Sequence, residues 1–297
     1  MGNKLLYALL FGLVKIHALL PFRALYIMSD ILYFFTYHVF RYRRKTVAKN
    51  LSNSFPTKTP AELAALERRF YHHFTDIIVE TVKLAHISKE DLLRRVEILN
   101  PDIFVDLIAQ GHTCFIITFA HYGNWEWFTG LFTNLWGNGA ENKLYFIYRP
   151  LSNKAFDRLF LYLRTRFSTF GIKKNSALRD IINIKRSGEP SIVGFVADQT
   201  PSKANIHYRT QFLNQDTAFF TGPERIAGKL DLPVAYGDFS SPKRGHYRVE
   251  FKLITDKPKE TPEFGITEQF ARLCEETIIR YPAFWLWTHK RWKHQPN

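Results

Sequence analysis

The chain has 297 residues, of which 46% are apolar, so it can form a packed core and is not a disordered protein. Its formal net charge of +14 predicts an anionic partner, which could be nucleic acid, an acidic protein or a phosphate-rich membrane surface. An aromatic content of 16% favours a membrane among these, because aromatic rings suit interfaces between apolar and wet regions. The two cysteines, Cys114 and Cys274, exclude a disulfide framework and predict buried thiols in a reducing compartment.

Residues 1–45 are strongly apolar and end in a basic cluster. The run 5–20 reads LLYALLFGLVKIHALL, and a second aromatic-rich run covers 24–40. The first run is shorter than the roughly 20 apolar residues of a spanning helix, and charged residues interrupt both runs. We therefore expect a membrane anchor that either spans once or lies in the interface, with the cluster RYRRK at 41–45 against anionic headgroups. The alternative is a pair of amphipathic helices buried within the protein.

The rest of the chain, 46–297, is expected to form one catalytic domain. Apolar residues at helical spacing predict one or two helices over 59–87 and short helices over 91–96 and 102–109. Runs rich in β-branched and aromatic residues then predict strands over 114–119, 144–148, 191–196, 234–239 and 247–254. Helical patterns are expected over 125–135, 153–167, 177–185, 223–230 and 268–281.

Strands that alternate with helices are typical of an α/β fold whose strands are buried on both faces. We therefore predict a mixed, mostly parallel central sheet flanked by helices. In such a sheet the ligand site lies beyond the carboxyl ends of the strands.

The stretch TFAHYGNWEW places His121 at the end of such a strand and Glu126 five residues later. On one continuous helix these residues would be rotated about 140° apart, so they can meet only across a turn. We expect Gly123 to permit this turn, Asn124 to cap it, and a helix to open at Trp125. Glu126 could then orient the imidazole, which would act as a base toward a hydroxyl. By itself the spacing is equally compatible with a capped helix beside a structural histidine.

Other chemistries lack their motifs. The sequence has no G-x-S-x-G elbow, Walker loop, G-x-G-x-x-G turn or H-E-x-x-H pair, so a hydrolase or a zinc enzyme is disfavoured and no metal site is expected. His72 and His73 are adjacent in a helical pattern and would not face each other, which predicts a structural role for both.

A series of blocks resembles the late acyltransferases of lipid A biosynthesis, a branch of the lysophospholipid acyltransferase superfamily. The blocks cover nearly the whole chain: HYGNWE, FIYRPLSN at 146–153, RTRF at 164–167, ADQTP at 197–201, FFTGPERIA at 219–227 and YPAFWLWTHKRWK at 281–293. The resemblance implies a glycerolipid acyltransferase-like fold in an enzyme of the bacterial inner membrane, with its active site on the cytoplasmic side. This enzyme would move a fatty acyl chain from acyl carrier protein onto a hydroxyl of a lipid A precursor, which is a phosphorylated glycolipid.

By this resemblance His121 is the general base and Glu126 its partner. Arg149 falls on the arginine of the Y-R-P block, where a fixed cation could hold a phosphate or an oxyanion. Asp198 and Gln199 match a D-Q pair at the end of a later strand, and a loop-stabilising role suits them equally well. Together with Asn124 they form the expected substrate-binding set.

The tail around Trp285, Trp287, His289 and Arg291 resembles the closing block of the family. It could be an interfacial anchor or a buried packing edge.

An acyl thioester is already activated, so no cofactor is expected. The cationic surface suits an acidic carrier protein, a phosphorylated acceptor and an anionic membrane.

Two alternatives stay open. One is an acyltransferase of the same superfamily that acts on a phospholipid or an aminolipid, with acyl-CoA as a possible donor. The other is a non-catalytic basic protein that binds membrane surfaces. Nucleic acid is disfavoured as a partner, because the basic residues are dispersed and no recognised module is present.

Overall fold

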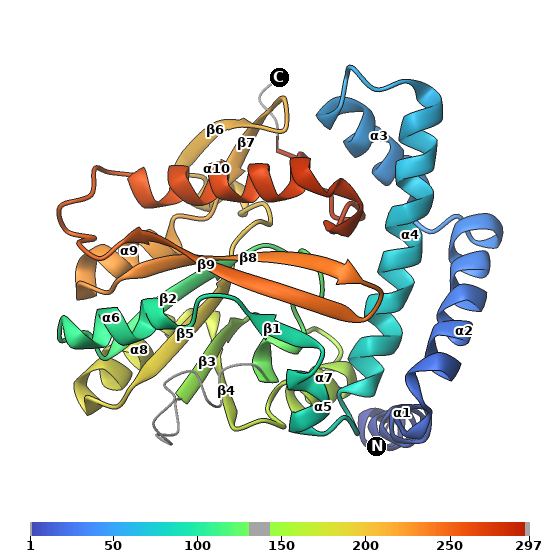
Figure 1. Ribbon diagram of the computed structural model, residues 1–297, viewed down its shortest axis with the longest axis horizontal. Helices are drawn as coiled ribbons and strands as arrows, with labels where there is room; N and C mark the ends of the chain where they lie inside the picture. Colours follow the sequence, from blue (N-terminus) through green and yellow to red (C-terminus); the bar gives the residue numbers. More distant parts are fainter. Residues whose placement is uncertain (1, 131–142, 295–297) are drawn as a thin grey trace.

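The protein is described by a computed structural model that covers residues 2–130 and 143–294. Its centre is a seven-stranded sheet in the order β1-β9-β8-β2-β5-β3-β4 (Figure 1). The strands are β1 (Val96–Ile98), β2 (Cys114–Phe119), β3 (Lys143–Tyr148), β4 (Thr169–Lys173), β5 (Ser191–Val196), β8 (Val234–Lys243) and β9 (His246–Thr255). A separate antiparallel pair consists of β6 (Tyr208–Phe212) and β7 (Gln215–Phe219).

The sheet is mixed and mostly parallel. Strands β8, β2, β5, β3 and β4 pair in parallel, whereas β9 is antiparallel to β8 and β1 is parallel to β9. All six residues of β2 are buried, as expected for a strand covered by helices on both faces. The predicted fold class is therefore confirmed for the sheet and its flanking helices.

The helices divide between the two faces of the sheet. Phe104 packs edge-on against Phe115 on one face, whereas Ile181 and Ile226 lie in a cluster with Ile116 on the other. The elements are α1 (Gly2–Leu19), α2 (Phe22–Tyr33), the π-helix η1 (Phe34–Val39), α3 (Arg44–Ser54), α4 (Pro60–Lys83), α5 (Lys89–Leu93), α6 (Asp102–Ala109), the 3₁₀ turn η2 (Trp127–Gly130), α7 (Lys154–Arg164), η4 (Lys174–Ser176), α8 (Ala177–Ser187), η5 (Lys203–Asn205), α9 (Gly222–Leu230), α10 (Gly265–Arg280) and η6 (Pro282–Phe284).

Helix α4 is the longest, and its start follows from the local sequence. Thr59 accepts a hydrogen bond from the Glu62 amide, Glu62 reaches back to the Thr59 amide, and Pro60 occupies the first helical turn. The helix runs past the turn of the β8–β9 hairpin, with α2 on its outer side (Figure 1).

The N-terminal helices pack against the body of the protein, and of the two alternatives for the expected anchor the structure does not support the spanning one. Within residues 2–130 and 143–294, no helix is long and apolar enough to cross a membrane. Helix α1 turns one face toward α7, where Phe11 lies edge-on to Tyr162 at a centroid distance of 5.0 Å. The opposite face of α1 carries exposed leucines and isoleucine, namely Leu5, Leu9, Leu13, Ile16 and Leu19. The division of the chain at residue 45 stays a prediction.

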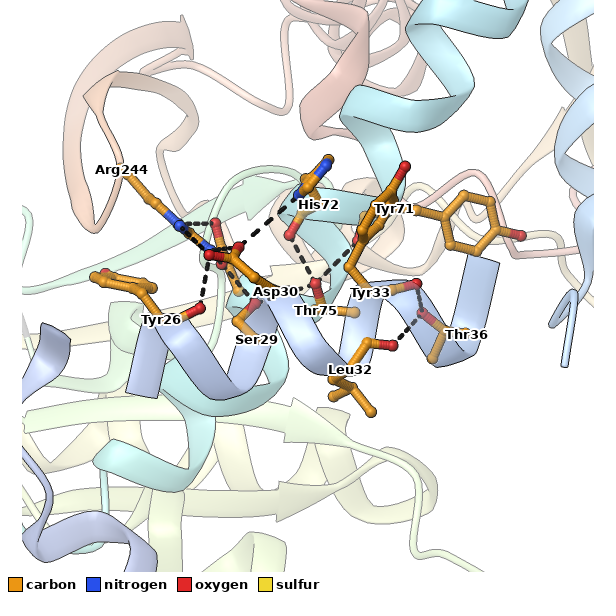
Figure 2. A network of polar contacts seen from close by, with 11 residues as sticks. Tyr26, Ser29, Asp30, Leu32, Tyr33, Thr36, Tyr71, His72, Thr75 and Arg244 are labelled. Atoms are coloured by element: carbon orange, nitrogen blue, oxygen red, sulfur yellow. Dashed lines mark hydrogen bonds and ion pairs between the residues drawn. The ribbon is translucent and has the colours of Figure 1, made fainter. Parts of the chain in front are cut away.

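A polar network joins α2, α4 and the β8–β9 turn (Figure 2). The Arg244 guanidinium of this turn donates to Asp30 of α2 and to Asp76 of α4, with a shortest N–O distance of 2.6 Å to each. Ser29 of α2 also donates to Asp76, at 2.6 Å. Helix α2 is therefore held by buried polar contacts as well as by apolar packing.

Three local expectations differ from the structure. Residues 91–96 do not form one helix, because α5 ends at Leu93 and Val96 begins strand β1 beside β9. The helix expected over 125–135 is, in its described part, a turn followed by η2, while 131–135 lie outside the described residues. Strands β4, β6 and β7 were not anticipated, because their pairing partners lie elsewhere in the chain and their own patterns are short.

Candidate active site

His121 lies two residues beyond the end of β2, and Asp198 lies two residues beyond the end of β5. These strands are adjacent and parallel, and Phe119 is in register with Val196. Because each residue lies two positions beyond this pair, the two side chains come together. His121 Nδ1 is 2.6 Å from Asp198 Oδ1, and the imidazole retains 18% exposure while the Asp198 side chain retains 3%.

Asp198 is held in its charged form although it is buried. Its second oxygen, Oδ2, accepts a hydrogen bond of 2.7 Å from the Trp285 indole. Burial opposes ionisation, but the adjacent His121 and the hydrogen bonds from His121 and Trp285 outweigh it and lower the pKa of Asp198. An ionised Asp198 accepts from Nδ1–H, which leaves the lone pair of the imidazole on Nε2.

Gln199 completes the surroundings of the imidazole. Its Nε2 lies 3.1 Å from His121 Nε2, so the amide N–H can donate to the lone pair on that nitrogen. Both ring nitrogens of His121 thus have a partner, and His121 and Gln199 both line a cleft.

Glu126 is paired with a cation instead of with His121. The Arg164 guanidinium donates to both of its oxygens, Nε to Oε2 at 2.7 Å and Nη2 to Oε1 at 2.6 Å. Burial again opposes ionisation, but Arg164 and the charge of His121 lower the pKa of Glu126. The expected turn therefore brings Glu126 near the imidazole, but within the described residues the hydrogen-bonding carboxylate of His121 belongs to Asp198.

The loop differs from the expected one, which explains why Glu126 does not pair with His121. No helix opens at Trp125, since η2 begins only at Trp127. The side chain of Trp125 donates to Glu126 Oε1 at 3.2 Å and packs edge-on to His121, with ring centroids 5.1 Å apart. The indole therefore lies against both groups.

Asn124 caps this turn as predicted, because its Oδ1 accepts a hydrogen bond from the Trp127 amide. Its Nδ2 donates to Glu80 Oε2 at 2.7 Å, and the side chain is buried. Asn124 is absent from the residues that line the cleft beside His121, so the described contacts give it a place in the scaffold of the loop. Its expected part in substrate binding stays a prediction.

The cleft has a volume of about 280 Å³ and brings together four of the predicted site residues, His121, Glu126, Arg149 and Gln199. Arg149 follows β3 and is exposed at the cleft. The remaining wall is largely apolar or aromatic and includes Trp125, Tyr148, Leu151, Phe160, Leu161 and Leu286. The cleft therefore combines an imidazole, two guanidinium groups and a largely apolar wall.

The sequence reasoning missed the parts played by Arg164 and Trp285. Arg164 stands in the RTRF block, and Trp285 in the closing block, but neither was linked to a particular carboxylate. Trp285 reaches Asp198 because a bridge pairs its backbone with Tyr122, directly after His121. The sequence of either block does not indicate which distant carboxylate its side chain will contact.

The two histidines of α4 do not face each other, as predicted, and the tail is a buried segment. His72 is exposed and stacks on Tyr33, whereas His73 is buried, so the pair does not share a face. In the tail, Trp287 and Arg291 are both buried, which makes this segment a packing edge and not an exposed anchor.

In the part of the chain that is described, no group of three histidine, cysteine, aspartate or glutamate side chains could hold a metal ion. Cys114 and Cys274 are free and buried, as predicted.

A histidine oriented by a buried carboxylate at the carboxyl edge of an α/β sheet is the arrangement of an enzyme site. The family described as bacterial lipid A biosynthesis acyltransferase matches residues 3–294, nearly the whole chain. The protein belongs to this family and is an enzyme that transfers acyl groups. A comparison with curated proteins gives no match.

Proposed function

We propose that the protein transfers a fatty acyl chain from an acyl carrier protein thioester to a hydroxyl of a lipid A precursor, with His121 as the general base. The observation that carries this proposal is the His121–Asp198 contact of 2.6 Å, at a cleft that His121 lines and that has an apolar wall. Family membership supports the acyl group and the glycolipid acceptor.

In the proposed reaction, the acceptor hydroxyl takes the place of the Gln199 amide at His121 Nε2. Nε2 accepts the hydroxyl proton while the oxygen attacks the thioester carbonyl, and Asp198 stabilises the imidazolium that forms. The C–S bond then breaks, and the thiolate leaves with the proton from the imidazolium. General-base assistance of this kind is worth about 10²–10⁴ in rate.

Two cations flank this chemistry. Arg164 is neutralised by Glu126, so we propose that it stabilises the loop around Trp125. Arg149 is exposed at the cleft and can approach the oxyanion or a phosphate of the acceptor. The excess of positive charge on the chain suits both an acidic carrier protein and an anionic membrane.

We further propose that the enzyme lies on the bacterial inner membrane from its cytoplasmic side, through the exposed stripe of α1. At 100° per residue, Leu5, Leu9, Leu13, Ile16 and Leu19 fall within an arc of about 120°. Such a stripe can enter the headgroup region without spanning the bilayer. Because α1 packs on α7, which lines the cleft, this orientation would bring the lipid acceptor to His121.

The test uses purified protein, an acyl carrier protein thioester and a lipid A precursor, with mass spectrometry of the lipid. We expect a product heavier by one acyl chain, and we expect His121→Ala to abolish it. His207→Ala removes an exposed histidine that does not line the cleft and serves as the matched control. Full activity of the His121 variant would refute the assigned base.

The same assay separates the remaining candidates. Equal rates with acyl-CoA would contradict the preference for carrier protein, and acylation of phospholipid alone would contradict the acceptor. Membrane binding without acyl transfer to either lipid would contradict both proposed acceptors.

A further inference from the structure

A second and larger cavity lies on the other side of the His121 loop. Its volume is about 750 Å³, and it is formed by α4, the β8–β9 turn and the segment around η6. It shares no lining residue with the His121 cleft. The wall between the two is the contact of the 121–124 loop with the tail, where the Gly123 amide donates to Phe284 O at 3.1 Å. Since β8 runs parallel to β2, both cavities lie at the same edge of the sheet.

The rim of this cavity is basic. Five lysines and arginines line it against two acidic residues, Glu62 and Asp76, a formal excess of +3. Two of the five are already neutralised, since Arg244 pairs with Asp30 and Asp76, and Arg280 pairs with Asp238. In the described chain no ion pair involves Lys58, Arg69 or Lys243, and Arg69 and Lys243 are exposed. Lys58 lies over the Phe55 ring and near Glu62, so Arg69 and Lys243 are the cations left to meet an anionic group.

The floor of the cavity is apolar. We use this name for the apolar lining residues Leu66 of α4 and Pro282, Ala283 and Phe284 of η6. A free inorganic anion would use only the rim, whereas an anionic headgroup attached to a hydrocarbon chain would use both the rim and the floor.

His73 adds an unsatisfied polar atom to this floor. The residue lines the cavity and is only 7% exposed, and its Nε2 has no hydrogen-bond partner among the described residues. Burial lowers the pKa of His73 to about 3, so the ring is neutral; with its other nitrogen bonded to the Gly123 backbone, Nε2 can accept a hydrogen bond from a ligand hydroxyl. A buried polar atom without a partner in the protein is a place where a ligand group would be stabilised.

The cavity also adjoins the apolar outer side of α2. Two of its lining residues contact that helix, since Arg244 donates to Asp30 and His72 stacks on Tyr33 (Figure 2). On the same helix, Ile27 and Ile31 are exposed on the side next to Asp30, and Phe34 follows them. A ligand that entered from this side would arrive with its hydrocarbon part along an apolar surface.

We propose that this cavity binds a phosphate-bearing lipid, with the phosphate at Arg69 and Lys243 and the hydrocarbon on the floor beside Phe284. The lipid can be the phosphorylated acceptor or a phospholipid of the bilayer, which share this chemistry. The binding site itself does not depend on the proposed reaction; only its use by the acceptor rests on it.

Calorimetric titration of the full-length protein with dodecyl phosphate below its micellar concentration tests the site. Dodecyl maltoside and inorganic phosphate serve as probes of the two halves of the ligand. We expect Arg69→Ala/Lys243→Ala to bind dodecyl phosphate about tenfold more weakly. Arg186→Ala/Lys229→Ala, which removes two exposed cations far from the cavity lining, should bind as the parent protein does.

Equal weakening in both double variants would overturn the site, and inorganic phosphate that binds as tightly as dodecyl phosphate would overturn the lipid. His121→Ala should bind dodecyl phosphate unchanged, so the site is judged separately from the acyl transfer.

Two further measurements identify the source of the lipid. If the acceptor occupies the cavity, Arg69→Ala/Lys243→Ala raises KM for the phosphorylated acceptor and leaves KM for its dephosphorylated form unchanged. If a bilayer phospholipid occupies it, both KM values stay constant, while flotation with vesicles that contain phosphatidylglycerol decreases relative to the control variant. No change in either measurement would overturn the proposal.

Discussion

Three buried carboxylates, Asp198, Glu126 and Glu80 of α4, lie around the 121–127 loop, and their pKa values are shifted in opposite directions. Asp198 and Glu126 each face a histidine or an arginine, and the pKa of both is lowered. Glu80 of α4 is fully buried too, but its hydrogen bonds come from Tyr26, Tyr247 and Asn124, which carry no positive charge. Burial therefore raises the pKa of Glu80 to about 7 despite these bonds.

The comparison teaches that burial alone does not decide the charge of a carboxylate here; the nature of the nearest partner does. At the cleft, Arg164 keeps Glu126 ionised, and His121 and Trp285 keep Asp198 ionised, so that Asp198 can orient the imidazole. Behind the loop, Glu80 is shared by neutral donors and holds Asn124 and the Trp127 indole, whose Nε1 donates to Glu80 O at 3.0 Å. Asp198 and Glu126 are therefore negatively charged at neutral pH, whereas Glu80 mainly fixes the position of its hydrogen-bond donors.

The largest expected effect comes from Asp198→Asn. The amide would present N–H to His121 Nδ1 and favour the tautomer whose proton is on Nε2, so the base would be lost. We expect the single-turnover rate of acyl transfer to fall about 10³–10⁴-fold, with little change in the free energy of unfolding. A variant with parental activity would show that Asp198 has no part in the reaction.

Next is Arg164→Met, which leaves Glu126 buried without its cation. We expect a loss of about 3 kcal/mol in the free energy of unfolding, measured with urea, because breaking a buried pair leaves an uncompensated charge. The double variant Arg164→Met/Glu126→Gln should recover much of this stability. If the double variant is no more stable than the single one, the charge of Glu126 is not the cause.

The third prediction is that the contribution of Glu80 to the free energy of unfolding depends on pH in the opposite sense to those of Asp198 and Glu126. Because the folded pKa of Glu80 lies above the ordinary value of 4.5, its contribution is fully present below about pH 4.5 and is lost as pH rises past about 7. The difference amounts to about 3 kcal/mol. The lowered pKa values of Asp198 and Glu126 act oppositely, and their contributions are lost as pH falls.

Glu80→Gln should remove the Glu80 contribution. We expect the variant to gain stability relative to the parent protein as pH rises from 5 to 8, as measured by urea unfolding at each pH. Parallel profiles for the two proteins would contradict the raised pKa.

The smallest effect is expected on the outer face of α1. Leu9→Ser/Leu13→Ser changes residues that are already exposed, so the free energy of unfolding should stay within about 0.5 kcal/mol of the parent value. Binding to anionic vesicles should weaken about tenfold, or about 1.4 kcal/mol, in a flotation assay. Val105→Ser alters an exposed apolar residue of α6 and serves as the control. Unchanged binding by the α1 variant would remove the proposed membrane face.

Much of the fold could be predicted because its signals are local. Each signal is contained in a short stretch of sequence. Examples are the capping box at Thr59 and the buried run of β2. The short strands β4 and β6 could not be predicted, since a three- to five-residue strand is stabilised by its partner and not by its own pattern. The sequence left open whether residues 1–45 span a membrane or lie in its interface, because it does not show which apolar residues of α1 pack on α7 and which face solvent.

The sequence by itself determined that His121 ends a buried strand beside a turn, and its blocks indicated the acyltransferase family. Only the tertiary structure decided which carboxylate serves the imidazole. The nearby Glu126 is taken by Arg164, whereas Asp198, 77 residues away in sequence, reaches Nδ1 through the register of β2 and β5. A hydrogen bond depends on separation in space, and the pairing of two parallel strands sets that separation independently of distance along the chain.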